Sequence, residues 1–146
     1  MSYTMEEKYK LIKDELIRSE SDNPLDIVKT IAKKEFVNIH GPEHHFLDGG
    51  ALLTASHNGG LEFDLGQALD MLAERSIKMP GAMCGHWGVC GAVASVGAVL
   101  SIMEGTGPLS NDEAYSKHMD ITSRILARMS EIGGPRCCKR NAFFNA

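Results

Sequence analysis

The segment from His86 to Glu104 constrains the fold of this chain most strongly, because it is rich in small residues. Glycine costs about 1 kcal/mol of helix stability relative to alanine, so a helix of this composition persists only when it is buried and tightly packed. A glycine- and proline-containing run at 105–108 then stops the helix. We therefore predict a close-packed central helix. Its small residues are Gly88, Gly91, Ala94, Ser95, Ala98 and Ser101.

The rest of the chain also carries helix signals. Thr4-x-x-Glu7 and Ser110-x-x-Glu113 match the capping-box pattern, and Pro24 suits the first turn of a helix. These patterns predict an all-α, single-domain bundle of five or six helices around the central Gly/Ala-rich helix. The other predicted helices begin near residues 4, 24, 41, 61 and 110, and the only short strand candidate is 35–39.

Length, charge and hydropathy narrow the class of protein. The chain of 146 residues has the size of one domain, so we predict a single helical domain over 1–146, with N-terminal helices at 1–39 and a motif-bearing core at 40–146. The net charge of −4 argues against nucleic acid as a partner, because nucleic-acid binders usually carry a basic face. The acidic N-terminus is unlike a signal peptide, and the weakly polar stretch at 81–103 is too glycine-rich to span a membrane. We expect a cytoplasmic protein without a membrane partner.

The four cysteines are too few to staple a fold and enough to build one site. On one continuous helix Cys84 and Cys90 would point about 120° apart. They can share a ligand only if Cys84 lies in a loop and Cys90 lies in the first turns of the helix, where the dipole favours the thiolate. The alternative is that Cys90 is one more small residue of a packed core.

A second pair of cysteines lies near the C-terminus. Cys137 and Cys138 are adjacent and flanked by the cations Arg136, Lys139 and Arg140. Those cations favour thiolates and are suited to an anionic substrate. A disulfide between neighbouring residues would be strained and easily reduced. The alternative is a solvated basic tail in which both thiols are incidental.

Histidines supply further candidate ligands. His44 and His45 are adjacent, so both cannot easily bind one ion from a regular helix, whereas His44 and Asp48 share a helix face at i, i+4. His86 is placed to join Cys84 and Cys90. HExxH, CxxC pairs, G-x-S-x-G and phosphate-loop patterns are missing from the sequence, so it assigns no named enzyme class.

Three segments together carry a family resemblance: GPEHH at 41–45, MCGHWGVCGA at 83–92 and GGPRCCKRN at 133–141. They resemble a prokaryotic family of unknown function, whose members occur alone or joined to larger enzymes, including methyltransferase-like ones. This resemblance covers about residues 40–145.

The run from Cys84 to Gly97 is also similar to the glycine-rich centre of the C-GCAxxG-C-C family of redox proteins. The resemblance implies that Cys84, Cys90, Gly91 and Ala92 match the CG…CGA element of that family, and that Cys137 or Cys138 stands in for its C-terminal cysteines. This chain has no cysteine before Cys84. A four-ligand site must therefore use both adjacent cysteines or recruit His44, His45 or His86.

Our leading hypothesis is that Cys84, Cys90, Cys137 and Cys138 converge on one site. That site would hold an iron–sulfur cluster or zinc, or act as a thiol redox or sulfur-handling centre. It would serve a small anionic substrate or a redox partner protein. The hypothesis requires the last ten residues to fold back onto the start of the central helix.

Two alternatives come from other classes. One is a non-catalytic helical module that forms a homo-oligomer or docks on a larger enzyme through the small-residue helix. The other is a hydrolase or lyase centred on Glu43, His44 and His45.

Overall fold

Every regular element in the described part of the chain is an α-helix, which confirms the predicted all-α class. The computed structural model describes residues 2–134, 138, 141, 145 and 146. Within these residues there are seven helices rather than five or six, and residues 35–39 form turns instead of a strand. The helices are α1 (Met5–Arg18), α2 (Pro24–Ile31), α3 (His44–Asn58), α4 (Leu65–Ser76), α5 (Met83–Trp87), α6 (Gly91–Glu104) and α7 (Glu113–Ile132).

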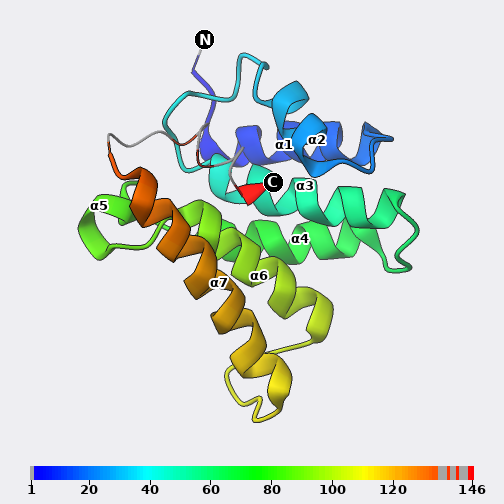
Figure 1. The fold of residues 1–146 in the computed structure, drawn as a ribbon. Helices are drawn as coiled ribbons and strands as arrows, with labels where there is room; N and C mark the ends of the chain where they lie inside the picture. Colours follow the sequence, from blue (N-terminus) through cyan, green and yellow to red (C-terminus); the bar gives the residue numbers. More distant parts are fainter. Residues whose placement is uncertain (1, 135–137, 139–140, 142–144) are drawn as a thin grey trace.

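Helix α3 lies at the centre of this single-domain bundle. It packs against α1, α2, α4 and α6, and Figure 1 shows it between the α1–α2 pair and α6. Two glycines make this packing possible, since a Cβ at Gly49 would overlap Ser95 of α6 and a Cβ at Gly50 would overlap Leu16 of α1. The sequence analysis was therefore wrong to place the small-residue segment at 86–104 in the central position, which α3 occupies.

The segment predicted as one helix from His86 to Glu104 is divided in two. The short helix α5 ends at Gly88, whose φ of 70° lies in the left-handed region that favours glycine. Helix α6 begins only at Gly91, after Cys90 as its N-cap residue. Helix α6 is nevertheless closely packed, against α3, α4 and α7. The break places Cys84 and Cys90 on separate elements.

Local signals at two helix starts are confirmed. The hydroxyl of Thr4 accepts a hydrogen bond from the Glu7 amide at 3.1 Å, and the Glu7 carboxylate accepts one from the Thr4 amide at 2.8 Å. Pro24 occupies the first turn of α2, and the Asn23 side chain accepts a hydrogen bond from the Leu25 amide. Both helices start where short-range patterns predict them to start.

The capping box predicted at Ser110 is wrong. Helix α7 begins after Asp112, and the Ser110 hydroxyl instead accepts a hydrogen bond from the Gly107 amide in the preceding turn. Serine favours such turns as much as it favours N-caps, so the pattern alone did not distinguish them.

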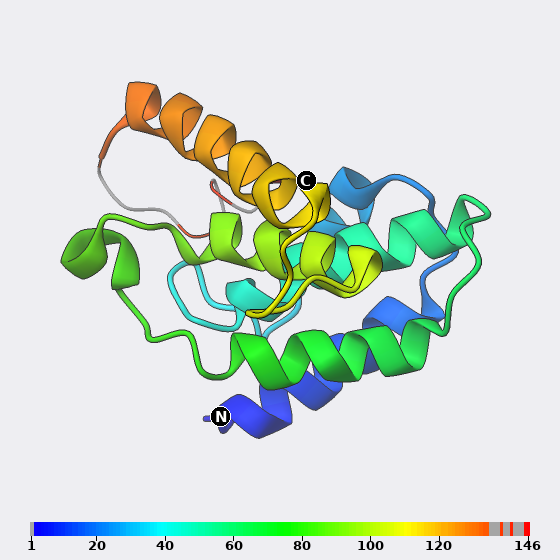
Figure 2. The same cartoon turned by 90° about the horizontal axis from the view of Figure 1, so that it is seen from below.

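Helix α7 lies at the edge of the bundle. It packs mainly on α6, and none of its residues is buried. Figure 2 shows it along the outer face of α6, on the side away from α1 and α4. Across the described residues, no helix is both long enough and apolar enough to cross a membrane.

Candidate thiol and histidine site

A pocket of about 270 Å³ lies where the start of α3 meets α5 and the start of α6. It brings together side chains that are far apart in the sequence, from residue 40 to residue 141. The pocket combines thiols, imidazoles, a carboxyl group and an amide. Its chemically active lining residues are His40, His44, His45, Asp48, Cys84, Cys90, Cys138 and Asn141.

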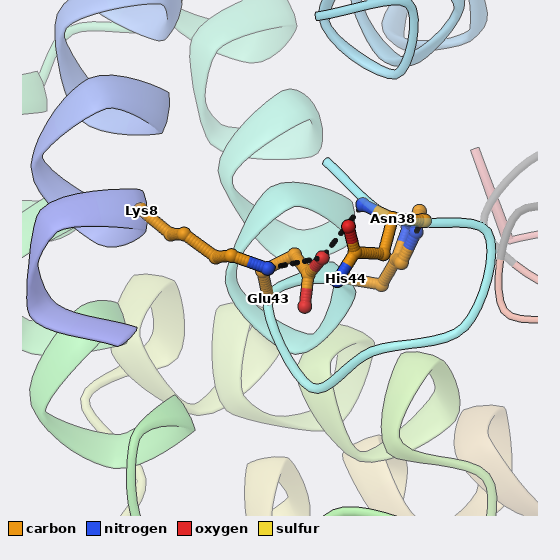
Figure 3. A network of polar contacts seen from close by, with 4 residues as sticks. All are labelled: Lys8, Asn38, Glu43 and His44. Carbon is orange, nitrogen blue, oxygen red and sulfur yellow. Dashed lines mark hydrogen bonds and ion pairs between the residues drawn. The ribbon is translucent and has the colours of Figure 1, made fainter. Parts of the chain in front are cut away.

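A buried ion pair fixes the entrance to α3 (Figure 3). The fully buried carboxylate of Glu43 accepts hydrogen bonds from Lys8 Nζ at 3.1 Å and from the Asn38 amide at 2.7 Å. A side chain at Gly41 would overlap that carboxylate, so glycine is required there. The contacts tie the loop before α3 to α1 and set the position of the histidines that follow.

The same loop orients the ring of His44. His44 Nε2 lies 2.7 Å from the backbone carbonyl of Asn38. A carbonyl only accepts hydrogen bonds, so Nε2 carries the hydrogen. Glu43 and His44 thus both form hydrogen bonds to the backbone of Asn38, Glu43 with its amide and His44 with its carbonyl.

His45 is buried against the start of α6. Its ring lies so close to Gly91 that a Cβ at residue 91 would overlap Nε2. Burial lowers the pKa of His45, the neighbouring His44 lowers it further, and the backbone of Met79 acts in the opposite direction. His45 is therefore a neutral imidazole at pH 7, which is the form that accepts a proton.

Asp48, one helical turn after His44, is buried without a hydrogen-bonding partner. Its exposed fraction is 2%, and neither carboxyl oxygen has a hydrogen-bonding partner among the residues that the structure describes. Burial raises the pKa of Asp48 well above its ordinary value, so the carboxyl group favours its protonated form. The i, i+4 relation with His44 is as predicted, but no hydrogen bond joins the two side chains.

Cys90 is a half-buried thiol at the N-cap position of α6. Burial raises its pKa, while the backbone amides of Ala92 and Val93 and the Asn141 side chain act in the opposite direction. Burial of the Cys90 thiol therefore raises its pKa by more than the amides at the helix terminus lower it, contrary to the expectation that the thiolate would be favoured there. Asn141 Nδ2 donates a hydrogen bond to Cys90 Sγ at 3.4 Å.

The structure brings three of the four predicted cysteines to one pocket. Cys84, Cys90 and Cys138 all line it. Cys90 lies at the start of α6, close to the predicted first turns, whereas Cys84 lies on the short helix α5 and not in the predicted loop. The contact from Asn141 to Cys90 confirms that the chain folds back onto the start of α6.

The remaining predicted residues are not part of the described pocket. Cys137, Arg136, Lys139 and Arg140 lie outside the described residues. His86 is exposed on α5 and does not line the pocket.

The predicted metal site requires several ligand side chains to lie around one point. Among the side chains that the structure describes, no group of three or more histidine, cysteine, aspartate or glutamate side chains is arranged to hold a metal ion. The described side chains alone therefore do not form a site that fits an iron–sulfur cluster or zinc.

A family model for a family of unknown function, DUF5714, matches residues 12–146. The chain belongs to the DUF5714 family. The match begins well before residue 40, where the sequence analysis placed the start of the resemblance, and it includes all three segments quoted for it. No curated protein and no solved structure matches the chain significantly.

The structure gives physical reasons for two of these segments in this DUF5714 chain. In GPEHH, Gly41 makes room for Glu43, and Glu43 and His44 hold Asn38. In MCGHWGVCGA, the left-handed Gly88 divides the helices, and Gly91 accommodates the His45 ring.

Sequence reasoning missed two residues of this DUF5714 site. Asp48 was considered only as a partner of His44. Its neighbours from Phe46 to Ala51 are all apolar or glycine, and a lone aspartate in such a stretch indicates a buried carboxyl group. Asn141 was not considered, and its contact with Cys90 spans 51 positions. A contact over that separation leaves no local pattern.

Proposed function

We propose that this DUF5714 protein is a thiol-centred redox or sulfur-handling protein, in which Cys84 and Cys90 exchange sulfur–sulfur bonds with a small substrate. The observation that carries the proposal is that both thiols line one pocket with the neutral imidazole of His45. Thiol–disulfide exchange needs an accessible thiolate, a second thiol and a base for its proton. The pocket contains side chains suited to each role.

The two thiols are both half-buried, and their surroundings distinguish their roles. Cys84 belongs to α5, which has no buried residue, whereas Cys90 directly precedes the buried Gly91. We therefore assign the first attack to Cys84. The Cys84 thiolate attacks one sulfur of a disulfide substrate, a mixed disulfide forms, and the first substrate thiolate leaves.

The second step uses Cys90. Because its raised pKa keeps Cys90 as a thiol, it needs a base, and we assign that role to the neutral His45, which lines the same pocket. Cys90 then attacks the Cys84 sulfur and releases the second substrate thiolate. The substrate disulfide is reduced to two thiols, while Cys84 and Cys90 are oxidised to one disulfide. Two molecules of a low-molecular-weight thiol then reduce the Cys84–Cys90 disulfide and are themselves oxidised to one disulfide, which supplies the two electrons for the next cycle.

The direct test is to mix the reduced protein with a small disulfide and to map its disulfides by mass spectrometry. We expect a Cys84–Cys90 bond in the wild type and a trapped Cys84 mixed disulfide in Cys90→Ser. Cys84→Ser should form neither product. If Cys84 and Cys90 stay reduced while the disulfide is in excess, the proposal fails.

A metal-bound form of the site is distinguished by a second measurement. Anaerobic purification, metal analysis and a visible spectrum detect an iron–sulfur cluster or zinc held by Cys84, Cys90, Cys137 and Cys138. We expect the protein to be colourless and to contain less than one metal ion per chain, because the described ligands are not arranged to hold a metal ion.

A second candidate function is a helical module that forms a homodimer. The observation that favours it is the long helix α7, none of whose residues is buried, although Tyr115, Met119 and Ile132 are large and apolar. Sedimentation equilibrium of the wild type and of Met119→Glu tests it. A dimer that dissociates in the variant while disulfide exchange is unchanged supports a separate assembly surface, and a monomeric wild type excludes it.

A further inference from the structure

The carboxyl group of Asp48 has no role in the exchange proposed above, yet it lines the same pocket. Both of its oxygens are buried and lack hydrogen-bonding partners within the described part of the chain, and its exposed fraction is 2%. Buried polar side chains in folded proteins are almost always paired, so an unpaired carboxyl group facing a cavity calls for an explanation.

The neighbours of Asp48 limit which chemical groups of a ligand can form hydrogen bonds to its carboxyl oxygens. Among the described lining residues of the pocket, Asp48 is the one carboxylate, and lysine and arginine are absent. Burial is the only cause that acts on its pKa, so no described cation lies close enough to stabilise its charge. An anionic group in contact with Asp48 would be repelled, whereas a group bearing N–H donors would satisfy both oxygens.

The pocket also limits the size of its occupant. Its volume of about 270 Å³ is smaller than the usual range for drug-sized ligands, so it suits a short molecule. Cys90 and Asp48 lie close enough for the charge of Asp48 to raise the pKa of the thiol. A ligand that meets both groups needs only a short spacer between its sulfur and its N–H donor.

We propose that Asp48 binds the ammonium group of a small aminothiol disulfide or persulfide, whose sulfur reaches Cys84 and Cys90. This assignment rests on the proposed thiol function and names its substrate class. It is a charge-assisted hydrogen bond to a buried carboxyl group, and such contacts are strong where the local dielectric constant is low. The alternative occupant of the space beside Asp48 is ordered water, which gives no preference among substrates.

Three small disulfides that differ in charge provide the test. Cystamine carries two ammonium groups, bis(2-hydroxyethyl) disulfide is neutral, and 3,3′-dithiodipropionate is anionic. The rate at which each oxidises Cys84 and Cys90 is divided by its rate with free glutathione, which removes differences in intrinsic reactivity. We expect the corrected rate for cystamine to exceed that for the neutral disulfide by about tenfold or more, as one charged hydrogen bond provides.

Two variants assign the preference to one carboxyl group. Asp48→Asn should lower the corrected cystamine rate to that of the neutral disulfide. Asp22→Asn, which changes an exposed carboxylate outside the pocket, should retain the full preference. Equal corrected rates for all three disulfides in the wild type would overturn the ammonium assignment and leave the thiol function intact. Failure of all three to oxidise either thiol would overturn the thiol function itself.

Calorimetry separates binding from chemistry and does not depend on the folding of Asp48→Asn. In the double variant Cys84→Ser and Cys90→Ser, cystamine should bind at least tenfold more tightly than bis(2-hydroxyethyl) disulfide, on the same reasoning of about one charged hydrogen bond. Cystamine binding no tighter than the neutral disulfide contradicts the assignment, whatever the kinetics show.

Discussion

The ring of His45 lies against the backbone of Gly91, so closely that a single added methyl group at residue 91 would overlap it. This contact joins the start of α3 to the start of α6 and places the imidazole beside the residue that follows Cys90.

Gly91→Ala should therefore disturb the start of α3 and the start of α6 at once. We expect the free energy of unfolding to fall by about 1–3 kcal/mol, the usual effect of overpacking, because the backbone or the His45 ring must shift. Urea denaturation followed by circular dichroism measures this loss. Gly107→Ala is the matched control, because a Cβ at residue 107 would meet nothing within 4 Å. Equal stability of the two variants would show that the ring moves freely.

Removal of Lys8 should destabilise the entrance to α3. The side chain of Glu43 is completely buried and that of Lys8 is 10% exposed, so Lys8→Ala leaves a buried charge without its partner. Losses of about 3–5 kcal/mol are typical of such changes. Lys117→Ala breaks the exposed pair with Glu104 and should cost less than about 1 kcal/mol. A similar small loss in both variants, measured by urea denaturation, would contradict the structural role of Lys8.

Protonation of His45 should oppose folding in acid. Its folded-state pKa lies below the ordinary value of 6.5, so the unfolded chain binds the proton more tightly. The free energy of unfolding should be insensitive to this group above pH 6.5 and should fall as the pH drops from 6.5 through the folded-state pKa. His45→Gln should remove this part of the decline, and the exposed His86→Gln should not. Denaturation curves at several pH values provide the comparison.

Asp48 should produce the opposite slope. Its folded-state pKa lies above the ordinary value of 3.8, so the folded chain binds the proton more tightly. Its contribution to stability is present below pH 3.8 and is lost as the pH rises through the folded-state pKa. Asp48→Asn should abolish this loss, and it should gain stability relative to the wild type as the pH increases toward 8. A constant difference between the two proteins across that range would show that Asp48 is not desolvated.

Short-range patterns predicted the helix starts correctly where the capping interaction joins residues within three positions of each other. Thr4 and Glu7 cap α1 as predicted, and Pro24 begins α2. The same reasoning failed at Ser110, because a turn and an N-cap both satisfy a serine hydroxyl. The all-α class follows from many such local signals, so one error did not alter it.

The composition of the small-residue segment predicted close packing but not which helix is central. A stretch of small side chains indicates that another helix packs closely against it. It does not indicate how many helices do so. Only tertiary contacts show that α3 touches four helices, through glycines at 49 and 50 that the sequence analysis did not single out.

The candidate site was predictable only in part, because some of its features are local in sequence and others depend on long-range contacts. The glycines around Cys84 and Cys90 indicated that the two thiols lie on different local structures. The details differ, because Cys84 lies on the short helix α5 and not in a loop, and the helix predicted from His86 to Glu104 begins only at Gly91. The meeting of His45 with Gly91 and of Asn141 with Cys90 depends on contacts across 46 and 51 positions. Such contacts depend on the packing of the whole bundle.

The peripheral position of α7 separates access to the thiols from the survival of the core. Helix α7 lines a hollow that also includes Cys84 and Cys90, yet it contributes no buried residue. It can detach in a local opening event that leaves α1 to α4 folded, and its amides should exchange with deuterium before theirs. Substitutions at α7 residues that line this hollow, such as Leu126 and Ser130, would then change how fast a reagent reaches the cysteines while leaving the melting temperature of the bundle almost constant. Reactivity and stability would thus evolve as separate properties of one small chain.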